Sequence, residues 1–351
     1  MRLSLAAKEK KPARSSKAAS AVQSDRGADA SGERKCSIAS TVGILSDAWT
    51  FLVIREAFFG SKRFEEFRSG LEITRATLTD RLRRLTAEGI LRETTYSDTS
   101  SRVEYKLTKA GIDLYPTFMA LMQFGDRWLE SSKDVPLQLI HESCNCVSKP
   151  FVACSCCHNK ISAREVTYQD GPGAGRVLVE AQRRSRRTAD DFMRGRPSSV
   201  SRALEVIGDR WSFLIIREAL YGASRFDQLQ TELNIATNIL TDRLARLVDR
   251  GVFKKQKYQS TPERFEYLLT PMGNDLHGPL MMMMAWGDRW RADGEPPMLL
   301  RHEACGQVFT PQVVCSRCGK PIDAFSMKYR MRYNPEKFGG RRSSRAVPGR
   351  V

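Results

Sequence analysis

The chain has 351 residues, enough for two or three domains, and 41% of them are hydrophobic, enough to build real cores. It contains no run of about eighteen apolar residues, which excludes a membrane span, and its N-terminus lacks the apolar stretch of a secretory signal, so we expect a cytoplasmic protein. A net charge of +17 favours a polyanionic partner, nucleic acid before an anionic membrane, although basic tails contribute to this total.

The chain carries an internal repeat. The segment LSDAWTFLVIREAFFGSKRFEEF at Leu45 matches IGDRWSFLIIREALYGASRFDQL at Ile207, at an offset of about 162 residues. In the same register, LTDRLRRLTAEGI at Leu78 matches LTDRLARLVDRGV at Leu240. The sequence is therefore a tandem duplication with units of about 160 residues.

Each unit has the same predicted order of elements. Apolar periodicity, glycines at helix ends and β-type runs predict four helices, a two-stranded hairpin and one long helix. In the first unit these are helices 37–45, 50–59, 63–69 and 74–88, strands 90–96 and 103–107, and a long helix 109–129. The second unit repeats them from 200 to 290 and has its long helix at 271–291. The fold class is mainly α with small β-wings (α+β), in which the third and fourth helices form a helix-turn-helix and the hairpin forms a wing.

Composition suggests the domain boundaries. Lys, Arg, Ser and Gly dominate the two ends of the chain and a central stretch that includes GPGAG and RRSRR. We expect basic tails at 1–35 and 336–351, a linker at 170–197, winged helix-turn-helix domains at 36–132 and 198–293, and small Cys/His knuckles at 133–169 and 294–335.

The fourth helix of each unit has an apolar stripe, Leu78, Leu82 and Leu85 in the first, that leaves a polar face free. Arg can pair with guanine, Asn with adenine, and Thr can contact a thymine methyl group or a phosphate, while arginines at the wing tips suit phosphates or a narrow minor groove. The predicted DNA-binding residues are Arg75, Thr77, Thr79, Arg81, Arg83 and Arg102 in the first unit and Thr237, Asn238, Thr241, Arg243 and Arg264 in the second. A solvated polar helix face is the alternative, which the helix-turn-helix order and the basic charge disfavour.

The two predicted reading faces differ. Thr237 replaces Arg75, Asn238 replaces Ala76 and Ile239 replaces Thr77. Two unlike units in one chain are suited to an asymmetric site with different half-sites.

Eight of the nine cysteines fall into two clusters, which is typical of metal binding and not of a disulfide framework. Each cluster follows the pattern His, two residues, Cys, nine residues, Cys, two residues, Cys, which suits a closed, structural zinc site. The predicted ligands are His141, Cys144, Cys154 and Cys157 in one knuckle and His302, Cys305, Cys315 and Cys318 in the other. Cys146, Cys156 and His158 leave the choice of ligands in the first knuckle open, and the histidines could be bystanders.

Two further features have structural interpretations. Asp47, Asp126, Asp209 and Asp288 lie near tryptophans in both units and are expected to act as helix caps or ion-pair partners. The methionine run 281–284 is expected to pack in a core, with an interface or a small-molecule pocket as the alternative.

The motifs DxWTFLVIREAFFG and DRWSFLIIREALYG, RFEEF and RFDQL, LTDRLxRL followed by Gly, and the YxLT turn together resemble the HxlR-type, MarR-like winged-helix regulators over about a hundred residues of each half. The resemblance implies dimerisation through the outer helices, and hence a pseudo-dimer of the two halves within one chain. It also implies a cysteine before the first helix that can be redox-active. Cys36 occupies that place, and Ser198 is its counterpart.

We therefore expect a non-enzymatic, sequence-specific regulator that binds double-stranded DNA, acts as a repressor and carries structural zinc. A small-molecule or redox effector and further dimerisation remain open, and no membrane partner is expected. The alternatives are a protein–protein adaptor built from winged-helix modules and a redox-sensing zinc–thiolate regulator.

Overall fold

The computed structural model describes residues 33–45, 47–97, 100–129, 135–177 and 196–334, so most of the expected tails and much of the expected linker lie outside the described residues. The predicted order of four helices followed by a hairpin is confirmed in both units. The first unit contains α1 (Ser37–Ile44), α2 (Ala48–Phe58), α3 (Phe64–Leu71), α4 (Arg75–Ala87), β2 (Leu91–Ser97) and β3 (Ser100–Leu107). The second contains α7 (Ser199–Ile207), α8 (Arg210–Leu220), α9 (Phe226–Leu233), α10 (Thr237–Asp249), β9 (Phe253–Ser260) and β10 (Glu263–Leu269).

Local sequence fixes where the helices begin. The Asp47 carboxylate caps α2 by accepting hydrogen bonds from the amides of Trp49 and Thr50, at 3.0 and 3.3 Å, and Asp209 caps α8 in the same way. Thr74 caps α4 through its hydroxyl, which accepts from the amide of Thr77. The predicted stripe of α4 is buried, with Leu78, Leu82 and Leu85 each 1% exposed or less.

The prediction of one long helix after each hairpin is wrong in one respect, because the structure has two helices there in both units. They are α5 (Lys109–Ile112) and α6 (Tyr115–Trp128) in the first unit and α11 (Pro271–Asp275) and α12 (His277–Arg291) in the second. Pro116 and Pro279 explain the breaks. Proline has no amide hydrogen and clashes with the carbonyl four residues earlier, and α5 and α11 end at those residues, Ile112 and Asp275.

The two units pack against each other through α1, α6, α7 and α12. Helix α1 contacts α12 and α7 contacts α6, in a symmetric arrangement. Both contacts depend on glycine, because a Cβ atom at Gly287 would lie 2.4 Å from the Ser37 carbonyl oxygen and one at Gly125 would lie 2.2 Å from that of Ser199. At the centre the rings of Phe51 and Phe213 stack, with their centroids 6.0 Å apart.

The repeated aspartates and the methionine run lie in this contact. The Ser37 hydroxyl donates to Asp288 at 2.5 Å, and the Ser199 hydroxyl donates to Asp126. All four methionines from 281 to 284 are buried, on a helix that packs against α1 and α6 of the first unit. The expected cap role is confirmed for Asp47 and Asp209, whereas Asp126 and Asp288 instead accept hydrogen bonds from serines of the other unit. The methionines are buried as expected, at the contact between the units that was the alternative.

Short strands absent from the sequence prediction follow the last helix of each unit. They are β4 (Leu137–His141), β5 (Cys146–Ser148), β6 (Phe151–Cys154) and β7 (Val166–Asp170), then β11 (Met298–His302), β12 (Gln307–Phe309), β13 (Pro311–Val314) and β14 (Met327–Met331). Their pairing crosses between the units, because β14 pairs with β4, β13 with β6 and β11 with β7. A further pair joins β1 (Glu33–Arg34) to β8 (Arg176–Val177), within the expected linker.

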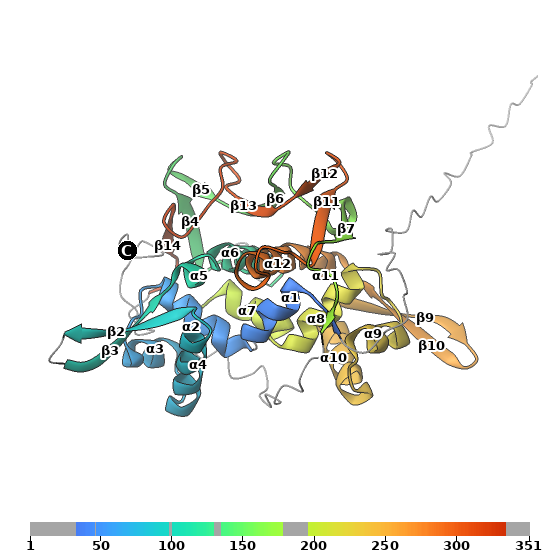
Figure 1. The fold of residues 1–351 in the computed structure, drawn as a ribbon, viewed down its shortest axis with the longest axis horizontal. Helices are drawn as coiled ribbons and strands as arrows, with labels where there is room; N and C mark the ends of the chain where they lie inside the picture. The colour runs from blue at the N-terminus through green and yellow to red at the C-terminus, as the bar shows by residue number, and fades with distance from the viewer. Residues whose placement is uncertain (1–32, 46, 98–99, 130–134, 178–195, 335–351) are drawn as a thin grey trace, which may run out of the picture.

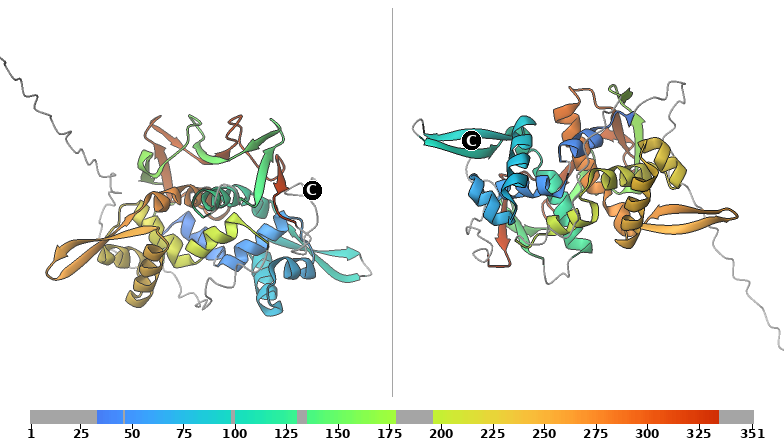
Figure 2. Two further views of the ribbon diagram at one scale, coloured as in Figure 1. Left: turned by 180° about the vertical axis from the view of Figure 1, so that it is seen from behind. Right: turned by 90° about the horizontal axis from the view of Figure 1, so that it is seen from below.

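The elements form layers (Figure 1). The exchanged strands lie on one side, the helices α6 and α12 lie beneath them, and α4 and α10 project from the opposite side. The two hairpins point away from each other at opposite ends of the molecule, as Figure 2 shows from behind and from below. Both expected recognition helices and both wings therefore lie toward the same side of the molecule.

Candidate DNA-binding surface and metal clusters

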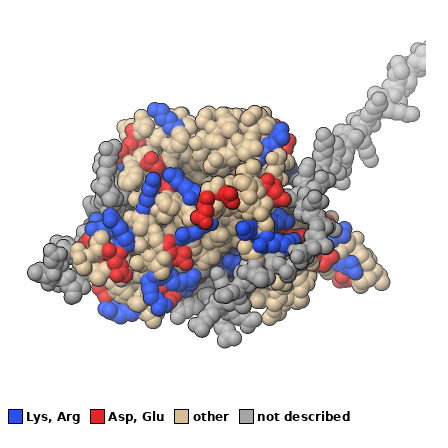
Figure 3. All heavy atoms as spheres, viewed as in Figure 1, with Lys and Arg blue, Asp and Glu red and all other residues tan. Residues whose placement is uncertain are grey.

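The most exposed predicted reading residues lie on α4 and α10. The side chains of Arg75 and Arg83 are 69% and 77% exposed, and Thr79 is exposed between them. On α10, Thr237, Asn238 and Thr241 are exposed. Lys and Arg side chains are visible among acidic ones at the lower left of Figure 3, the side on which α4 lies.

Arg75 already has partners within the protein, but they lie at the surface. Its guanidinium pairs with Glu65 at 2.6 Å and lies 5.4 Å from the centre of the Phe64 ring. Glu65 is itself 57% exposed, so water screens this ion pair and its net contribution to stability is small. The pair positions Arg75 and leaves it able to exchange Glu65 for a guanine or a phosphate.

Three predicted DNA-binding residues are directed inward. Thr77 is only 7% exposed and its hydroxyl bonds that of the capping Thr74. Arg81 pairs with Asp47 at 2.9 Å and is 13% exposed, and Arg243 makes the same 2.9 Å pair with Asp209 and is 21% exposed. Although burial opposes ionisation, the Asp209 and Asp242 carboxylates raise the pKa of Arg243 above its usual value. These arginines tie each fourth helix to the cap of the helix behind it, and their role as reading residues stays a prediction.

The wings bring a further basic cluster. Arg264 is exposed on β10, whereas the side chain of Arg102 on β3 lies outside what the structure describes. The prediction missed Lys254, Lys255 and Lys257, which are exposed on β9. The run KKQK, separated by four residues from the end of the fourth helix, was the available signal, and the first wing has only Arg92 over the equivalent positions.

The Cys and His side chains form two compact clusters, but the structure groups them differently from the sequence interpretation. His141 and Cys144 of the first unit meet Cys315 and Cys318 of the second, and Cys154 and Cys157 meet His302 and Cys305. The reason is the crossed strand pairing, which places the CxxC turn of each unit against the HxxC turn of the other. The eight residues are those predicted, whereas the assignment of one cluster to each knuckle is wrong.

Within each cluster the four candidate ligand atoms lie within 4.8 Å of one another. Cys144 Sγ lies 3.9 Å from Cys315 Sγ, and His141 Nδ1 lies 3.6 Å and 3.2 Å from the sulfurs of Cys144 and Cys318. In the other cluster, Cys154 and Cys305 are also 3.9 Å apart. Sulfurs joined in a disulfide are about 2.0 Å apart, so these thiols are not oxidised pairs.

The remaining thiols and His158 lie outside the two clusters. Cys146 and Cys156 are exposed, and their thiols face the carbonyl oxygens of Cys144 and Val308. His158 is exposed and its Nδ1 lies 3.2 Å from the Gln312 amide. Of the candidate ligands in the first knuckle, the two clusters therefore contain His141, Cys144, Cys154 and Cys157 only.

Within each cluster the two thiols of the CxxC turn have pKa values shifted in opposite directions. Burial opposes ionisation of Cys315, yet hydrogen bonds from Ser148 and from the amides of Arg317 and Cys318 lower the pKa of its thiol to about 6. Burial raises the pKa of its counterpart Cys154 to about 11. The other thiol of each pair shifts the opposite way. The Lys320 amide opposes the shift, yet burial and hydrogen bonds with Cys315 and Cys144 raise the pKa of Cys318. A hydrogen bond from the Asn159 amide lowers the pKa of Cys157. Each cluster therefore has one readily ionised thiol, and thiolate is the form that binds metal.

Cys36 is the half-buried residue that precedes α1. It lies within electrostatic reach of two buried groups of the second unit, Arg217 and Tyr221. Its counterpart Ser198 caps α7 by accepting from the amide of Ser201. The thiol thus lies where the two units meet, and a redox role for it remains a hypothesis.

Among the described residues no helix is both long and apolar enough to cross a membrane.

The chain is similar in sequence to several known proteins. An uncharacterized HTH-type transcriptional regulator of Mycobacterium tuberculosis, MT3179, is 46% identical over 128 residues, which cover 36% of this chain and 80% of the relative. The regulator sll1512 of Synechocystis, also named HTH-type, is 36% identical over 112 residues, 32% of this chain and 76% of the relative. The solved structure of the redox regulator HypR in its reduced form is 29% identical, covers 27% of this chain and 94% of that chain, and has a TM-score of 0.26.

The sequence model of the HxlR-like helix-turn-helix family matches residues 44–133 and 206–295, together just over half of the chain. The chain therefore belongs to the HxlR-like helix-turn-helix family, in two tandem copies.

Proposed function

We propose that this protein is a sequence-specific transcriptional repressor in which one chain reads both halves of a double-stranded DNA site. The observation that carries the proposal is the placement of two exposed, chemically different recognition helices, α4 and α10, toward the same side of one packed molecule. A homodimer presents two identical helices and reads a palindrome, whereas this chain presents two unlike helices.

The unlike positions define the expected difference between the half-sites. Arg75 on α4 is suited to guanine, while Thr237 and Asn238 at the start of α10 favour adenine and thymine contacts. Further along, Ala245 on α10 occupies the position equivalent to Arg83 on α4, and both residues are exposed. Thr77 is buried, so the difference between it and Ile239 does not enter the readout.

The wings supply the contacts that carry no sequence information. The second wing, with three lysines on β9, is expected to contact phosphates or a narrow minor groove. Each phosphate contact releases counterions from DNA, so affinity falls steeply as salt rises. We expect Arg264→Ala to weaken binding to all sequences, and Arg75→Ala to relax base preference in one half-site only.

Selection of binding sites from a random duplex library, at two salt concentrations, tests the proposal. We expect a bipartite site whose halves differ. Retention of DNA without an enriched motif would indicate an architectural DNA protein. No retention even at low salt would exclude DNA binding and favour the alternative, a protein–protein adaptor; the exposed arginines of α4 and the lysines of β9 argue against that alternative.

We propose that zinc occupies both Cys₃His clusters in a structural role. In a tetrahedral site with Zn–S distances of about 2.3 Å, the sulfurs lie about 3.8 Å apart. The Cys144–Cys315 and Cys154–Cys305 separations of 3.9 Å fit this requirement. Four protein ligands leave no open coordination position, which is typical of a structural site and not of a catalytic one.

Because each cluster takes two ligands from each unit, bound zinc would cross-link the units far from the DNA side. Zinc binding would then stabilise the pairing of the units and the relative placement of α4 and α10. Oxidation of the thiolates would release the metal and loosen that pairing, which gives the redox-sensing alternative a physical basis.

Metal content of purified double variants tests both the zinc and the grouping. Cys144→Ser with Cys315→Ser disables one cluster, so about half of the zinc should remain. Cys144→Ser with Cys154→Ser disables both clusters, so little zinc should remain. The control Cys146→Ser with Cys156→Ser should keep all of it. The reverse pattern in the first two variants would restore the grouping by knuckle, and no zinc in the unmodified protein would reject the metal.

A further inference from the structure

Two cavities lie between the helices α6 and α12 and the exchanged strands, one in each pseudo-symmetric half. The first has a volume of about 530 Å³ and is lined by α6, by the region where α11 meets α12, and by β6 with the loop that follows it. The second has a volume of about 690 Å³ and is lined by the equivalent parts of the other half. Both fall within the range of small-molecule sites, about 300–1,000 Å³.

The walls of the two cavities differ in charge. The first is lined by four cationic side chains, Arg127, Lys149, Lys160 and Arg164, and by one carboxylate, Asp275. The second is lined by one cation, Arg289, and by three carboxylates, Asp113, Asp288 and Asp323. Duplication of one ancestral unit explains the shared shape, while substitution at equivalent positions, such as Lys160 for Pro321 and Arg164 for Phe325, makes only the first cavity cationic.

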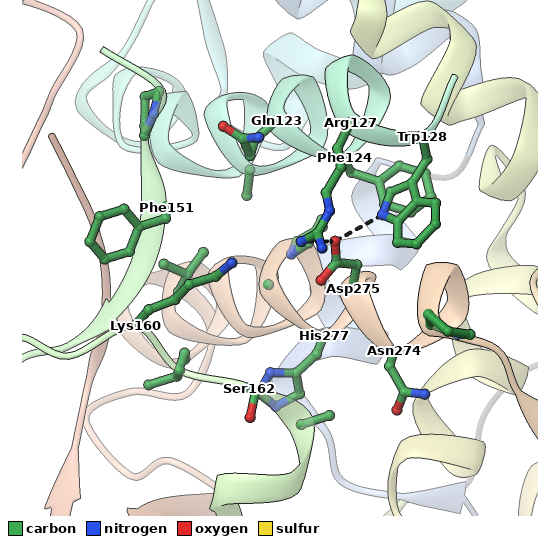
Figure 4. A pocket seen from close by; sticks show the side chains of 18 of the residues that line it. Gln123, Phe124, Arg127, Trp128, Phe151, Lys160, Ser162, Asn274, Asp275 and His277 are labelled. Atoms are coloured by element: carbon green, nitrogen blue, oxygen red, sulfur yellow. Dashed lines mark hydrogen bonds and ion pairs between the residues drawn. The ribbon is translucent and has the colours of Figure 1, made fainter. Parts of the chain in front are cut away.

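The one carboxylate of the first cavity is already neutralised. Asp275 pairs with Arg127 at 2.8 Å and accepts a hydrogen bond from the Trp128 indole at 2.8 Å (Figure 4). Lys149, Lys160 and Arg164 make no ion pair with any residue that the structure describes. The cavity therefore presents three uncompensated positive charges, and Figure 4 shows Lys160 extending from the strand side toward Arg127 and Asp275.

The rest of the wall is apolar and aromatic with a few polar groups. Phe124 and Trp128 of α6 and Phe151 of β6 provide ring surfaces. His277, at the start of α12, is 2% exposed; its Nε2 lies 3.1 Å from the Tyr168 hydroxyl and its Nδ1 has no hydrogen-bond partner among the described residues. Burial lowers the pKa of His277 to about 4, so at neutral pH it offers an uncharged ring nitrogen.

We propose that the first cavity binds an aromatic organic acid, with its ring against the aromatic side chains of the wall and its anionic group at Lys160 and Arg164. The equivalent cavity, with its acidic wall, does not bind this ligand. Because the cavity is lined by both α6 and α12, the bound acid contacts both units and can bias how they pair. Its role as an effector of DNA binding rests on the proposed function, whereas its binding does not.

Fluorescence titration of the full-length, metal-loaded protein with 1-anilinonaphthalene-8-sulfonate tests the site. We expect saturable binding that 1-naphthoate displaces and that the neutral 1-naphthamide, which has the same shape, displaces at least about tenfold less well, because the amide cannot form charge-assisted hydrogen bonds with lysine and arginine. Lys160→Gln with Arg164→Gln should weaken probe binding at least about tenfold. The matched control, Lys254→Gln with Lys257→Gln on the second wing, removes the same charge elsewhere and should leave it unchanged.

Equal displacement by naphthoate and naphthamide, or equal binding by the Lys160/Arg164 variant and the unmodified protein, would overturn the site. The effect on DNA is measured separately, as the affinity for a selected DNA site with and without 1-naphthoate. If the probe binds as expected and naphthoate leaves DNA affinity unchanged, the effector role is rejected and the site stands. Absence of DNA binding altogether rejects the proposed function and leaves the probe result intact.

Discussion

Arg81 and Arg83 on α4 are expected to have different roles: Arg81 stabilises the fold, and Arg83 contacts DNA. Replacing Arg81 by Ala removes a guanidinium that is 13% exposed and pairs with Asp47 at 2.9 Å. Loss of one partner from a buried ion pair costs about 3–5 kcal/mol. Asp47 keeps its hydrogen bonds from the amides of Trp49 and Thr50 and from the Thr50 hydroxyl, so we expect about 2–3 kcal/mol of lost stability. Arg83→Ala, at a side chain 77% exposed, should change stability by about 0.5 kcal/mol or less.

Denaturant and thermal unfolding of the two variants measure this difference. About 2–4 °C of melting temperature is lost per kcal/mol in a domain of about 150–250 residues, so Arg81→Ala should lower it by roughly 4–12 °C. DNA affinity, measured at a temperature where both variants are folded, should reverse the order: Arg83→Ala loses about tenfold and Arg81→Ala loses little. Equal stability of the two variants, or loss of DNA binding by Arg81→Ala alone while folded, would refute the assignment of Arg81 to the helix contact.

Three further outcomes are expected. Burial raises the pKa of Asp288 from 3.8 to about 6, so its ionisation destabilises the folded protein as pH rises through that range. Asp288→Asn should therefore gain stability relative to the unmodified protein between pH 4 and 7. A difference in unfolding midpoint that does not depend on pH would contradict this. Phe51→Ala removes a fully buried ring that packs on Phe213 and Phe118 and should cost about 3–5 kcal/mol in chemical denaturation, whereas a cost below about 1 kcal/mol would mean that the rings are not packed as described. Gly287→Ala places a methyl group 2.4 Å from the Ser37 carbonyl oxygen and should lower the melting temperature. Gly278→Ala, whose nearest contact is a Val152 methyl group at 3.2 Å, should have a smaller effect, and equal effects would argue against the close packing of α1 on α12.

Local sequence patterns were sufficient for the first four helices and the hairpin of each unit. Apolar spacing identifies the buried stripe of α4, and glycine and aspartate mark helix ends, because these signals act over a few residues. The same helical periodicity placed Arg81 and Thr77 on the exposed face. It could not show that Asp47, about 34 residues earlier in the chain, lies within reach of Arg81, or that Thr77 serves the cap of its own helix.

Long-range pairing was beyond the sequence. Ligand spacing identified all eight Cys and His side chains of the two clusters, yet it could not show which half-pairs meet, since HxxC and CxxC turns are equally compatible within a unit and between units. The answer depends on β6 pairing with β13 and β4 with β14, strands of four or five residues that carry little pattern of their own. The helix breaks before Pro116 and Pro279, in contrast, could have been predicted from proline chemistry alone, although the sequence analysis placed one unbroken helix there.

The central claim is that one chain reads two unlike half-sites through α4 and α10. It is tested most directly by making the helices alike, with Thr237→Arg, Asn238→Ala and Ala245→Arg, which copy the exposed residues of α4 onto exposed positions of α10. Site selection with the unmodified protein should give an asymmetric sequence, and selection with the variant should give two matching halves at the same spacing. Selection of the same site by both proteins would contradict the claim that α10 reads DNA.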